Sequence, residues 1–169
     1  MKSLLVILFF CPLFSYGVTV QNRFNREVSV IKSIINRLNP SLSSKFTNRL
    51  AISVQKATST HKICPRIYLA ILMQESAFNM KAVGCATRGC VDFGISQINI
   101  ATIAHYSLQQ TRLMTDLDYA VVAGARILSD IKIKYSKSDK TWWSRYNSYK
   151  PTHRRKYEMK VQRWIIAHN

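Results

Sequence analysis

The sequence Gln-Glu-Ser-Ala-Phe-Asn at residues 74–79, followed at 92–99 by Asp-Phe-Gly-Ile-Ser-Gln-Ile-Asn, decides how this chain is interpreted. Glu75 follows apolar residues at helical spacing, namely Ile67, Tyr68, Ile71 and Leu72. This spacing predicts a helix over about 65–76 with Glu75 on its apolar stripe. A carboxyl group at the rim of an apolar surface loses hydration, so its pKa rises and it can act as a general acid. A salt-bridged or snorkelling glutamate at a helix end fits the same pattern.

The remaining pattern is mainly helical. Apolar residues recur at helical spacing over about 28–38, 43–57, 120–135 and 157–165. Asn39-Pro40 ends the first of these segments, and Pro65 suits the first turn of the helix that carries Glu75. Between residues 84 and 99, glycines alternate with β-branched residues, which predicts a small hairpin or irregular β segment. The fold class is therefore mainly α (α+β).

The N-terminus has the pattern of a secretory signal peptide. Lys2 precedes an apolar run from Leu4 to Phe14, and Ser15-Tyr16-Gly17 supplies small residues before a cleavage site. We expect residues 1–17 to be removed and the mature chain to be secreted across the inner membrane, into the periplasm or the extracellular space. An uncleaved anchor is the alternative, although the apolar run is shorter than a membrane-spanning helix requires. The remainder suits one domain.

The chain is strongly basic, with 25 Lys and Arg against 8 Asp and Glu and a formal net charge of +17. Such a charge attracts polyanions. Secretion argues against nucleic acid and favours cell-wall polymers or outer-leaflet lipids as the anionic partner. A solvated, solubilising surface accounts for the same composition.

Three cysteines lie beyond the expected signal peptide: Cys64, Cys85 and Cys90. A disulfide is expected in an oxidising compartment. A Cys85–Cys90 bridge is preferred because it would fix the loop between the two halves of the opening sequence, and Cys64 with either partner is the alternative. These cysteines and His61 are also usable zinc ligands, but their spacing is irregular, so no metal is expected.

Most catalytic motifs are absent from the sequence. The segment Gly94-Ile95-Ser96-Gln97-Ile98 lacks the last glycine of a nucleophile elbow, and there is no metalloprotease, phosphate-loop or dinucleotide motif. Carboxylate chemistry remains. Glycosidic cleavage usually uses two carboxylates, and Asp92 is the nearest partner of Glu75 in sequence. A structural role for Asp92, bonded to the backbone around Gly94, is favoured, because such aspartates are common in turns. The aromatic cluster at 142–146 suits sugar stacking, but core packing is its commoner role.

Three motifs, in this order, resemble those of soluble lytic transglycosylases: Glu75-Ser76-x-Phe78-Asn79-x-Lys81-Ala82, then residues 92–99, then Tyr146-Asn147-Ser148. The similarity is strongest to the small, single-domain members that accompany conjugation, type III and type IV secretion and pilus systems. It covers about residues 45–168. The resemblance implies a lysozyme-like fold over 45–169 and cleavage of the MurNAc–GlcNAc β-1,4 bond of peptidoglycan without water. Residues 18–44 lie outside it and are expected to form an N-terminal helical extension.

The resemblance also implies a role for individual residues. Glu75 corresponds to the single acid/base, which protonates the leaving oxygen and then takes the proton of the MurNAc C6 hydroxyl. The substrate's N-acetyl group supports the charged intermediate, and the product carries a 1,6-anhydro ring. The corresponding substrate-binding residues are Ser76, Gln97, Asn99, Tyr146 and Asn147. No cofactor is implied. Expected partners are glycan strands and components of the machinery, and the chain is expected to be a monomer.

Three positions depart from the family's pattern. Gly84 stands where many members have Ser, Ser96 replaces a common Met in the groove wall, and Tyr149 replaces a usual Gly. Two other functions stay open from the sequence. One is a lysozyme-type hydrolase in which Asp92 helps a water molecule, and the other is a non-catalytic protein that binds the cell wall or a polyanion. The sequence also leaves open which apparatus, a secretion system, a conjugative plasmid or a phage, the protein would serve.

Overall fold

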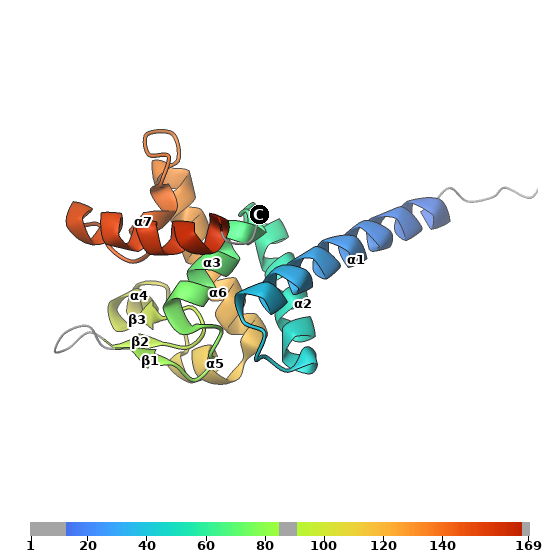
Figure 1. The fold of residues 1–169 in the computed structure, drawn as a ribbon, viewed down its shortest axis with the longest axis horizontal. Coiled ribbons are helices and arrows are strands. Elements are labelled where there is room, and N and C mark those ends of the chain that lie inside the picture. The colour runs from blue at the N-terminus through green and yellow to red at the C-terminus, as the bar shows by residue number, and fades with distance from the viewer. Residues whose placement is uncertain (1–12, 85–90, 167–169) are drawn as a thin grey trace, which may run out of the picture.

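The helix that carries Glu75, α3 (Pro65–Ser76), lies at the centre of the computed structural model, which describes residues 13–84 and 91–166 (Figure 1). Its side chains Tyr68, Leu69, Ile71 and Leu72 are fully buried. It packs against α1 (Leu13–Leu38), α2 (Ser44–His61) and α7 (Pro151–Ile166). The sequence prediction of an apolar helix ending near Glu75 is therefore confirmed.

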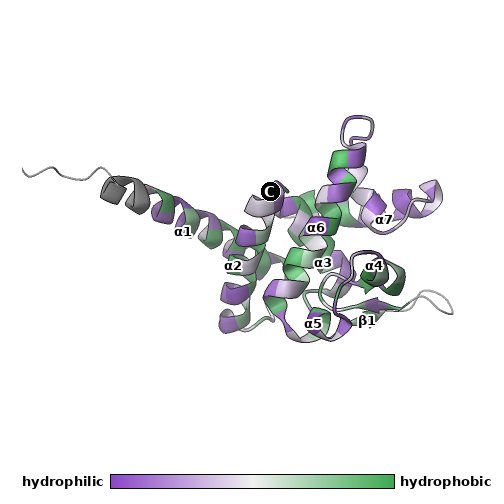
Figure 2. Ribbon diagram, turned by 180° about the vertical axis from the view of Figure 1, so that it is seen from behind, coloured by the Kyte–Doolittle hydropathy of each residue, from purple (hydrophilic) through white to green (hydrophobic). Residues whose placement is uncertain are grey.

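The other long helices match their predicted positions but extend further. α2 continues past the expected end at residue 57 and reaches His61. It ends there because Lys62 adopts a left-handed backbone (φ 55°). At its start, the Ser43 hydroxyl accepts a bond from the Phe46 N–H at 3.2 Å. α6 (Leu117–Tyr135) is capped at its start by Asp116, whose carboxylate accepts from the Tyr119 N–H. Figure 2 shows hydrophobic and hydrophilic residues alternating around these helices, as packing into one core requires.

α1 extends well beyond the rest of the molecule (Figure 1). Only its C-terminal half is anchored, because Ile31, Ile34, Ile35 and Leu38 are buried where it packs against α2 and α3. The helix runs without interruption through position 17, where the predicted signal peptide would end. Within the described residues, no helix is both long enough and apolar enough to cross a membrane.

The β segment predicted near 84–99 is a small antiparallel sheet in the order β1 (Val83–Gly84), β2 (Asp92–Phe93), β3 (Ile98–Asn99). Its register aligns Gly84 with Asp92 and Asp92 with Asn99. Gly94 follows β2 with φ 73°, and a Cβ there would lie 2.1 Å from the Leu113 carbonyl oxygen. Only glycine therefore fits this turn.

Two short helices, α4 (Ile100–His105) and α5 (Gln110–Thr115), were not predicted. Each has six residues. That length gives too few turns for an apolar period to show in the sequence. α5 packs against α6 and β2 and thereby lies beside the small sheet (Figure 1).

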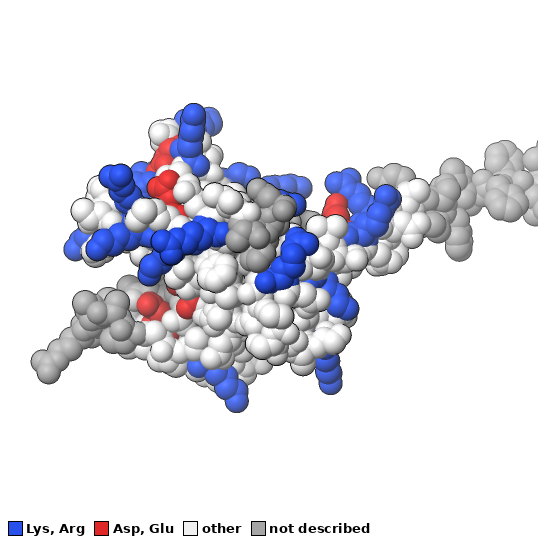
Figure 3. All heavy atoms as spheres, viewed as in Figure 1, with Lys and Arg blue, Asp and Glu red and all other residues white. Residues whose placement is uncertain are grey.

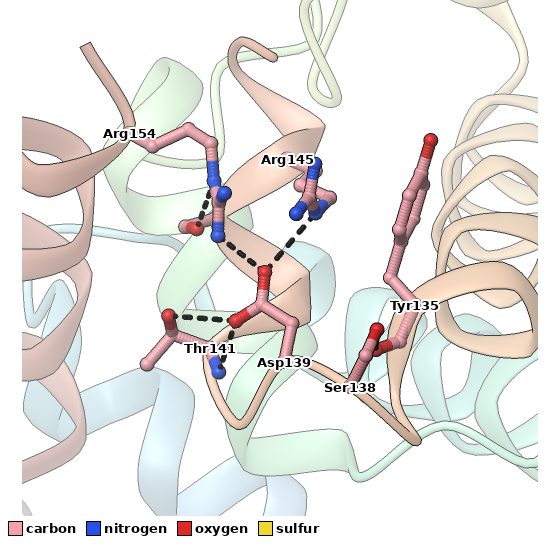
Figure 4. A network of polar contacts seen from close by, with 7 residues as sticks. Tyr135, Ser138, Asp139, Thr141, Arg145 and Arg154 are labelled. Atoms are coloured by element: carbon pink, nitrogen blue, oxygen red, sulfur yellow. Dashed lines mark hydrogen bonds and ion pairs between the residues drawn. The ribbon is translucent and has the colours of Figure 1, made fainter. Parts of the chain in front are cut away.

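The segment between α6 and α7 is fixed by the carboxylate of Asp139 (Figure 4). Its Oδ1 accepts from the backbone N–H and the hydroxyl of Thr141, at 3.0 and 3.2 Å. Its Oδ2 accepts from Arg145 at 3.1 Å and from Arg154 of α7. Burial opposes ionisation, but the Thr141 N–H and the Arg154 charge outweigh it and lower the pKa of Asp139. We name this group the Asp139 cluster: Asp139, Thr141, Ser144, Arg145 and Arg154.

The Asp139 cluster joins the short 3₁₀ helix η1 (Trp142–Tyr146) to α7. Trp142 and Trp143 of η1 are buried, so their role in this aromatic cluster is core packing, as favoured from the sequence. Because η1 carries Tyr146 and α7 carries Tyr157, the cluster sets the relative position of two tyrosines that reach the site described below.

Cys64 precedes α3 as an exposed free thiol. The preferred Cys85–Cys90 bridge lies outside the described residues, as do two of the four candidate zinc ligands. Among the residues that are described, no group of three or more His, Cys, Asp or Glu side chains could hold a metal ion.

Candidate active site

A cavity of about 450 Å³ opens where the end of α3, the small sheet and η1 meet. Five of the six predicted site residues line it, and Asp92 joins them: Glu75, Asp92, Gln97, Asn99, Tyr146 and Asn147. Residues that are up to 72 positions apart in sequence are thereby brought to one place. Ser76 is the predicted site residue that does not line this cavity.

Ser76 instead holds the helix end against the following loop. Its hydroxyl donates to the Ile95 carbonyl at 2.7 Å. The chain then reverses through Ala77 and Phe78, which both have positive φ values of 51° and 67°. Left-handed backbone at two consecutive residues with side chains is costly, and the fully buried Phe78 ring anchors it. This reversal ends α3 one residue after Glu75 and leaves the carboxyl group facing the cavity.

The environment of Glu75 favours its protonated form. The pKa of this carboxyl group is raised from 4.5 to about 7, mainly by burial and to a smaller extent by the negative charge of Asp92. A hydrogen bond from Tyr157, which donates to Oε1 at 2.5 Å, and the charge of Lys160 act in the opposite direction. The net result is a carboxylic acid that keeps its proton close to neutral pH, as a general acid requires.

Tyr157 is a site residue that sequence reasoning missed. Its position on the apolar stripe of the terminal helix predicted a core residue, and its ring is indeed buried. Burial, and then the nearby Glu75 carboxyl group, raise the pKa of the Tyr157 phenol, so it remains a donor. Its hydroxyl crosses from α7 to α3, a contact between residues 82 positions apart that no local pattern encodes.

The sequence suggested that Asp92 bonds to the backbone around Gly94. In the structure, its partner is instead the side chain of Asn99. Asn99 donates from Nδ2 to Asp92 Oδ1 at 3.1 Å. The Asn99 Oδ1 atom in turn accepts from the Ala101 N–H at 2.9 Å and caps α4. The register of β2 and β3 places the two side chains opposite one another.

The side chain of Gln97 links the segments before β1 and after β2. Its Nε2 donates to the carbonyls of Ala82 (3.0 Å) and Gly94 (2.9 Å). Its Oε1 lies only 2.3 Å from where a Cβ of residue 84 would stand. Gly84, one of the departures from the family's pattern, therefore makes room for the Gln97 side chain in this conformation.

Ser96 does not belong to the groove wall, contrary to expectation. It is buried and donates to the Ala120 carbonyl at 3.2 Å, next to Gly124 of α6. The backbone carbonyl of Ser96 accepts from the Tyr146 hydroxyl at 2.9 Å, which fixes that ring at the cavity. Tyr149, the third departure, is 60% exposed and lies outside the cavity lining.

A second cavity of about 240 Å³ continues on the α7 side of Glu75. It shares Glu75, Asn147 and His153 with the first and adds Lys156, Tyr157 and Lys160, together with Gln74. The two cavities form one cleft with the acid in its middle. Such a cleft suits an extended ligand that lies on both sides of Glu75.

Comparison with known proteins agrees with this geometry. Residues 52–164 match the family model described as the transglycosylase SLT domain. No match was found among curated proteins or among solved structures. The matched region includes all the residues that line the cleft and leaves α1 outside.

Proposed function

The chain belongs to the SLT transglycosylase domain family, and from that premise we propose that it cleaves the MurNAc–GlcNAc β-1,4 bond of peptidoglycan with formation of 1,6-anhydro-MurNAc. The observation that carries the proposal is the state of Glu75, whose carboxyl group has a pKa of about 7 in the middle of a cleft lined by polar side chains.

In the first step, the protonated Glu75 donates its proton to the glycosidic oxygen, and the C1–O bond of MurNAc breaks. The positive charge that develops at C1 is supported by the N-acetyl oxygen of the same sugar. Tyr157, bonded to Glu75 Oε1, stabilises the carboxylate that this step leaves behind.

In the second step, the Glu75 carboxylate takes the proton of the MurNAc C6 hydroxyl, whose oxygen closes on C1. The acid is thereby restored, and no water enters the product. A pKa near neutrality suits both steps, because the same group must first give and then accept a proton.

Asp92 supports a second candidate, a lysozyme-type hydrolase, because it lines the same cavity as Glu75. Two carboxylates around one glycosidic bond are the usual arrangement for hydrolysis. The bond from Asn99 to Asp92 and the raised pKa of Glu75 favour the one-carboxylate route.

We further propose that residues 1–17 direct secretion and that the enzyme opens the wall locally for a secretion, conjugation or phage apparatus. The support for secretion is the sequence pattern of the N-terminus and the location of peptidoglycan outside the cytoplasm. The support for a role in such an apparatus is the resemblance to small members that accompany these systems.

The decisive experiment is digestion of purified sacculi with the wild type and with Glu75→Gln, followed by mass spectrometry of the muropeptides. We expect anhydro ends from the wild type and near-total loss of product from the variant. Reducing ends would identify a hydrolase, and substantial clearing by Glu75→Gln would overturn the role of Glu75. Sacculus binding without any product would identify the non-catalytic alternative.

A stability measurement tests whether the variant is folded. Because the folded state raises the pKa of Glu75, the wild type loses stability as pH rises from 4.5 to about 7. Glu75→Gln carries no such charge, so above that window it should be more stable than the wild type, by up to about 3 kcal/mol. Below about pH 4 the two proteins should unfold at similar denaturant concentrations.

A further inference from the structure

Four cationic or titratable side chains line the α7 side of the cleft: Lys150, His153, Lys156 and Lys160. We name them the cationic rim. All four are exposed. The last three follow one another at intervals of three and four residues along α7, which places them on the helix face that also carries Tyr157. Since Tyr157 contacts Glu75, this face is the one turned toward the acid.

The surface view shows the same arrangement. In Figure 3, Lys and Arg side chains extend along α7 above a hollow, and acidic atoms lie within that hollow below them. Lys150 and His153 line the larger part of the cleft, whereas His153, Lys156 and Lys160 line the smaller part. The positive charge therefore accompanies the cleft on both sides of Glu75.

The charge of the rim is not neutralised within the part of the chain that the structure describes. None of the ion pairs found there involves Lys150, Lys156 or Lys160. Glu75 carries little negative charge below neutral pH, because burial raises its pKa to about 7.

Two other carboxylates, Asp92 in the cleft and Glu158 on α7, form no ion pair with the rim lysines in the described part of the chain. Asp92 accepts from Asn99, and Glu158 of α7 accepts from Gln162. The rim is therefore available to an external anion.

A neutral sugar backbone offers no negative charge that could bind to the cationic rim, but peptidoglycan is not neutral. Its MurNAc units bear either a free lactyl carboxylate or a stem peptide with several carboxylates. We propose that the cationic rim binds these strand carboxylates and makes an anionic strand the preferred substrate. This inference rests on the proposed function and specifies which strands the same site selects.

The test compares strands whose charge has been removed. Four substrates are prepared: peptide-bearing strands, amidase-stripped strands with a free lactyl carboxylate, and each of these after conversion of the carboxylates to primary amides. Initial rates at low ionic strength give kcat and KM for each. The enzymes are the wild type, the double variant Lys150→Gln/Lys156→Gln and the matched control Lys45→Gln/Lys56→Gln, whose lysines are exposed on α2 and line neither cavity.

We expect amidation to lower kcat/KM of the wild type by about tenfold, mainly through KM. The rim variant should lose less than about twofold on amidation, whereas the control should lose about as much as the wild type. The pair of substrates that shows the effect identifies its source, the stem peptide or the lactyl group. Lys160 is left unchanged because its charge also acts on the pKa of Glu75.

Two outcomes would overturn the inference. One is a rim variant that keeps the full response to amidation. The other is an equal loss of response in the control, which would assign the effect to net charge. Either result leaves the proposed function intact as long as anhydro products form. If the wild type releases none from any substrate, the proposed function itself fails.

Discussion

The hydrogen bond between Tyr157 and Glu75 makes a sharp prediction about pH dependence. Tyr157→Phe removes the hydroxyl that donates to Glu75 Oε1 at 2.5 Å and leaves the buried ring in place. This bond stabilises the carboxylate and holds the pKa of Glu75 down, so its loss raises that pKa. In the proposed mechanism, the first step needs the protonated acid. The alkaline limb of the kcat/KM profile should therefore move to higher pH.

The size of the shift follows from the strength of the bond. A hydrogen bond to a charged group contributes about 1.5–3 kcal/mol, and one pKa unit corresponds to about 1.36 kcal/mol. Water entering beside the phenylalanine would replace part of the lost bond, so a shift of about one unit is expected. The limb would then move from about pH 7 to about pH 8.

The titration can be followed directly, because the chain has only three glutamates: Glu27, Glu75 and Glu158. Labelling the glutamate carboxyl carbons with ¹³C gives three NMR signals, and the signal missing from Glu75→Gln belongs to Glu75. Asp92→Asn is the opposing control, because the negative charge of Asp92 raises the pKa of Glu75. A Tyr157→Phe signal that titrates at or below the wild-type pH would refute the reasoning.

Two further substitutions test the elements that position the site. Asp139→Asn weakens the ion pairs with Arg145 and Arg154. We expect the free energy of unfolding in urea to fall by about 2–3 kcal/mol, and kcat to fall with it. Unchanged stability would show that the Asp139 cluster does not hold α7 in place. Ala77→Gly relieves an exposed left-handed residue (φ 51°) and should raise the unfolding midpoint by about 2–4 °C, whereas a lower midpoint would show that this turn is not strained.

Local pattern was enough to predict much of the fold. The helix around Glu75 could be predicted because Tyr68, Ile71 and Leu72 repeat at helical spacing. All three side chains are buried in the structure. The β segment was predicted because glycines alternate with β-branched residues between 84 and 99, and one of these glycines, Gly94, occupies a backbone conformation that favours glycine. By contrast, α4 and α5 are too short to show a period, and no rule of spacing indicated them.

The residues of the site could be predicted only where they belong to a motif that resembles the family's. Glu75, Gln97, Asn99, Tyr146 and Asn147 were named from the sequence, and the structure brings all five to one cavity. Ser76 was named with them, but its hydroxyl is used by the Ile95 carbonyl. Motif resemblance identifies which positions matter without saying whether each side chain faces the substrate or the protein.

Tyr157 and the Asp139 cluster could not be foreseen, because both depend on tertiary contacts. The hydroxyl of Tyr157 meets a carboxyl group 82 positions away, and its neighbours in sequence gave only an apolar stripe. Asp139 stands in a polar segment where an aspartate is ordinary. Its four bonds become visible only when η1 and α7 are in place.

The distinction between transglycosylase and hydrolase depends on what Asp92 does. The structure supports a role in which its charge acts on Glu75 and in which it activates no water molecule. Its Oδ1 accepts from Asn99, while its charge raises the pKa of Glu75. As a charge, it helps Glu75 stay protonated near neutral pH; as a general base, it would itself be needed in every turnover. Asp92→Asn therefore separates the two roles. If Asp92 acts only as a charge, the variant should keep most of its kcat below the pKa of Glu75 and lose activity only as the alkaline limb moves to lower pH. If Asp92 activates water, kcat should fall by at least about a hundredfold at every pH.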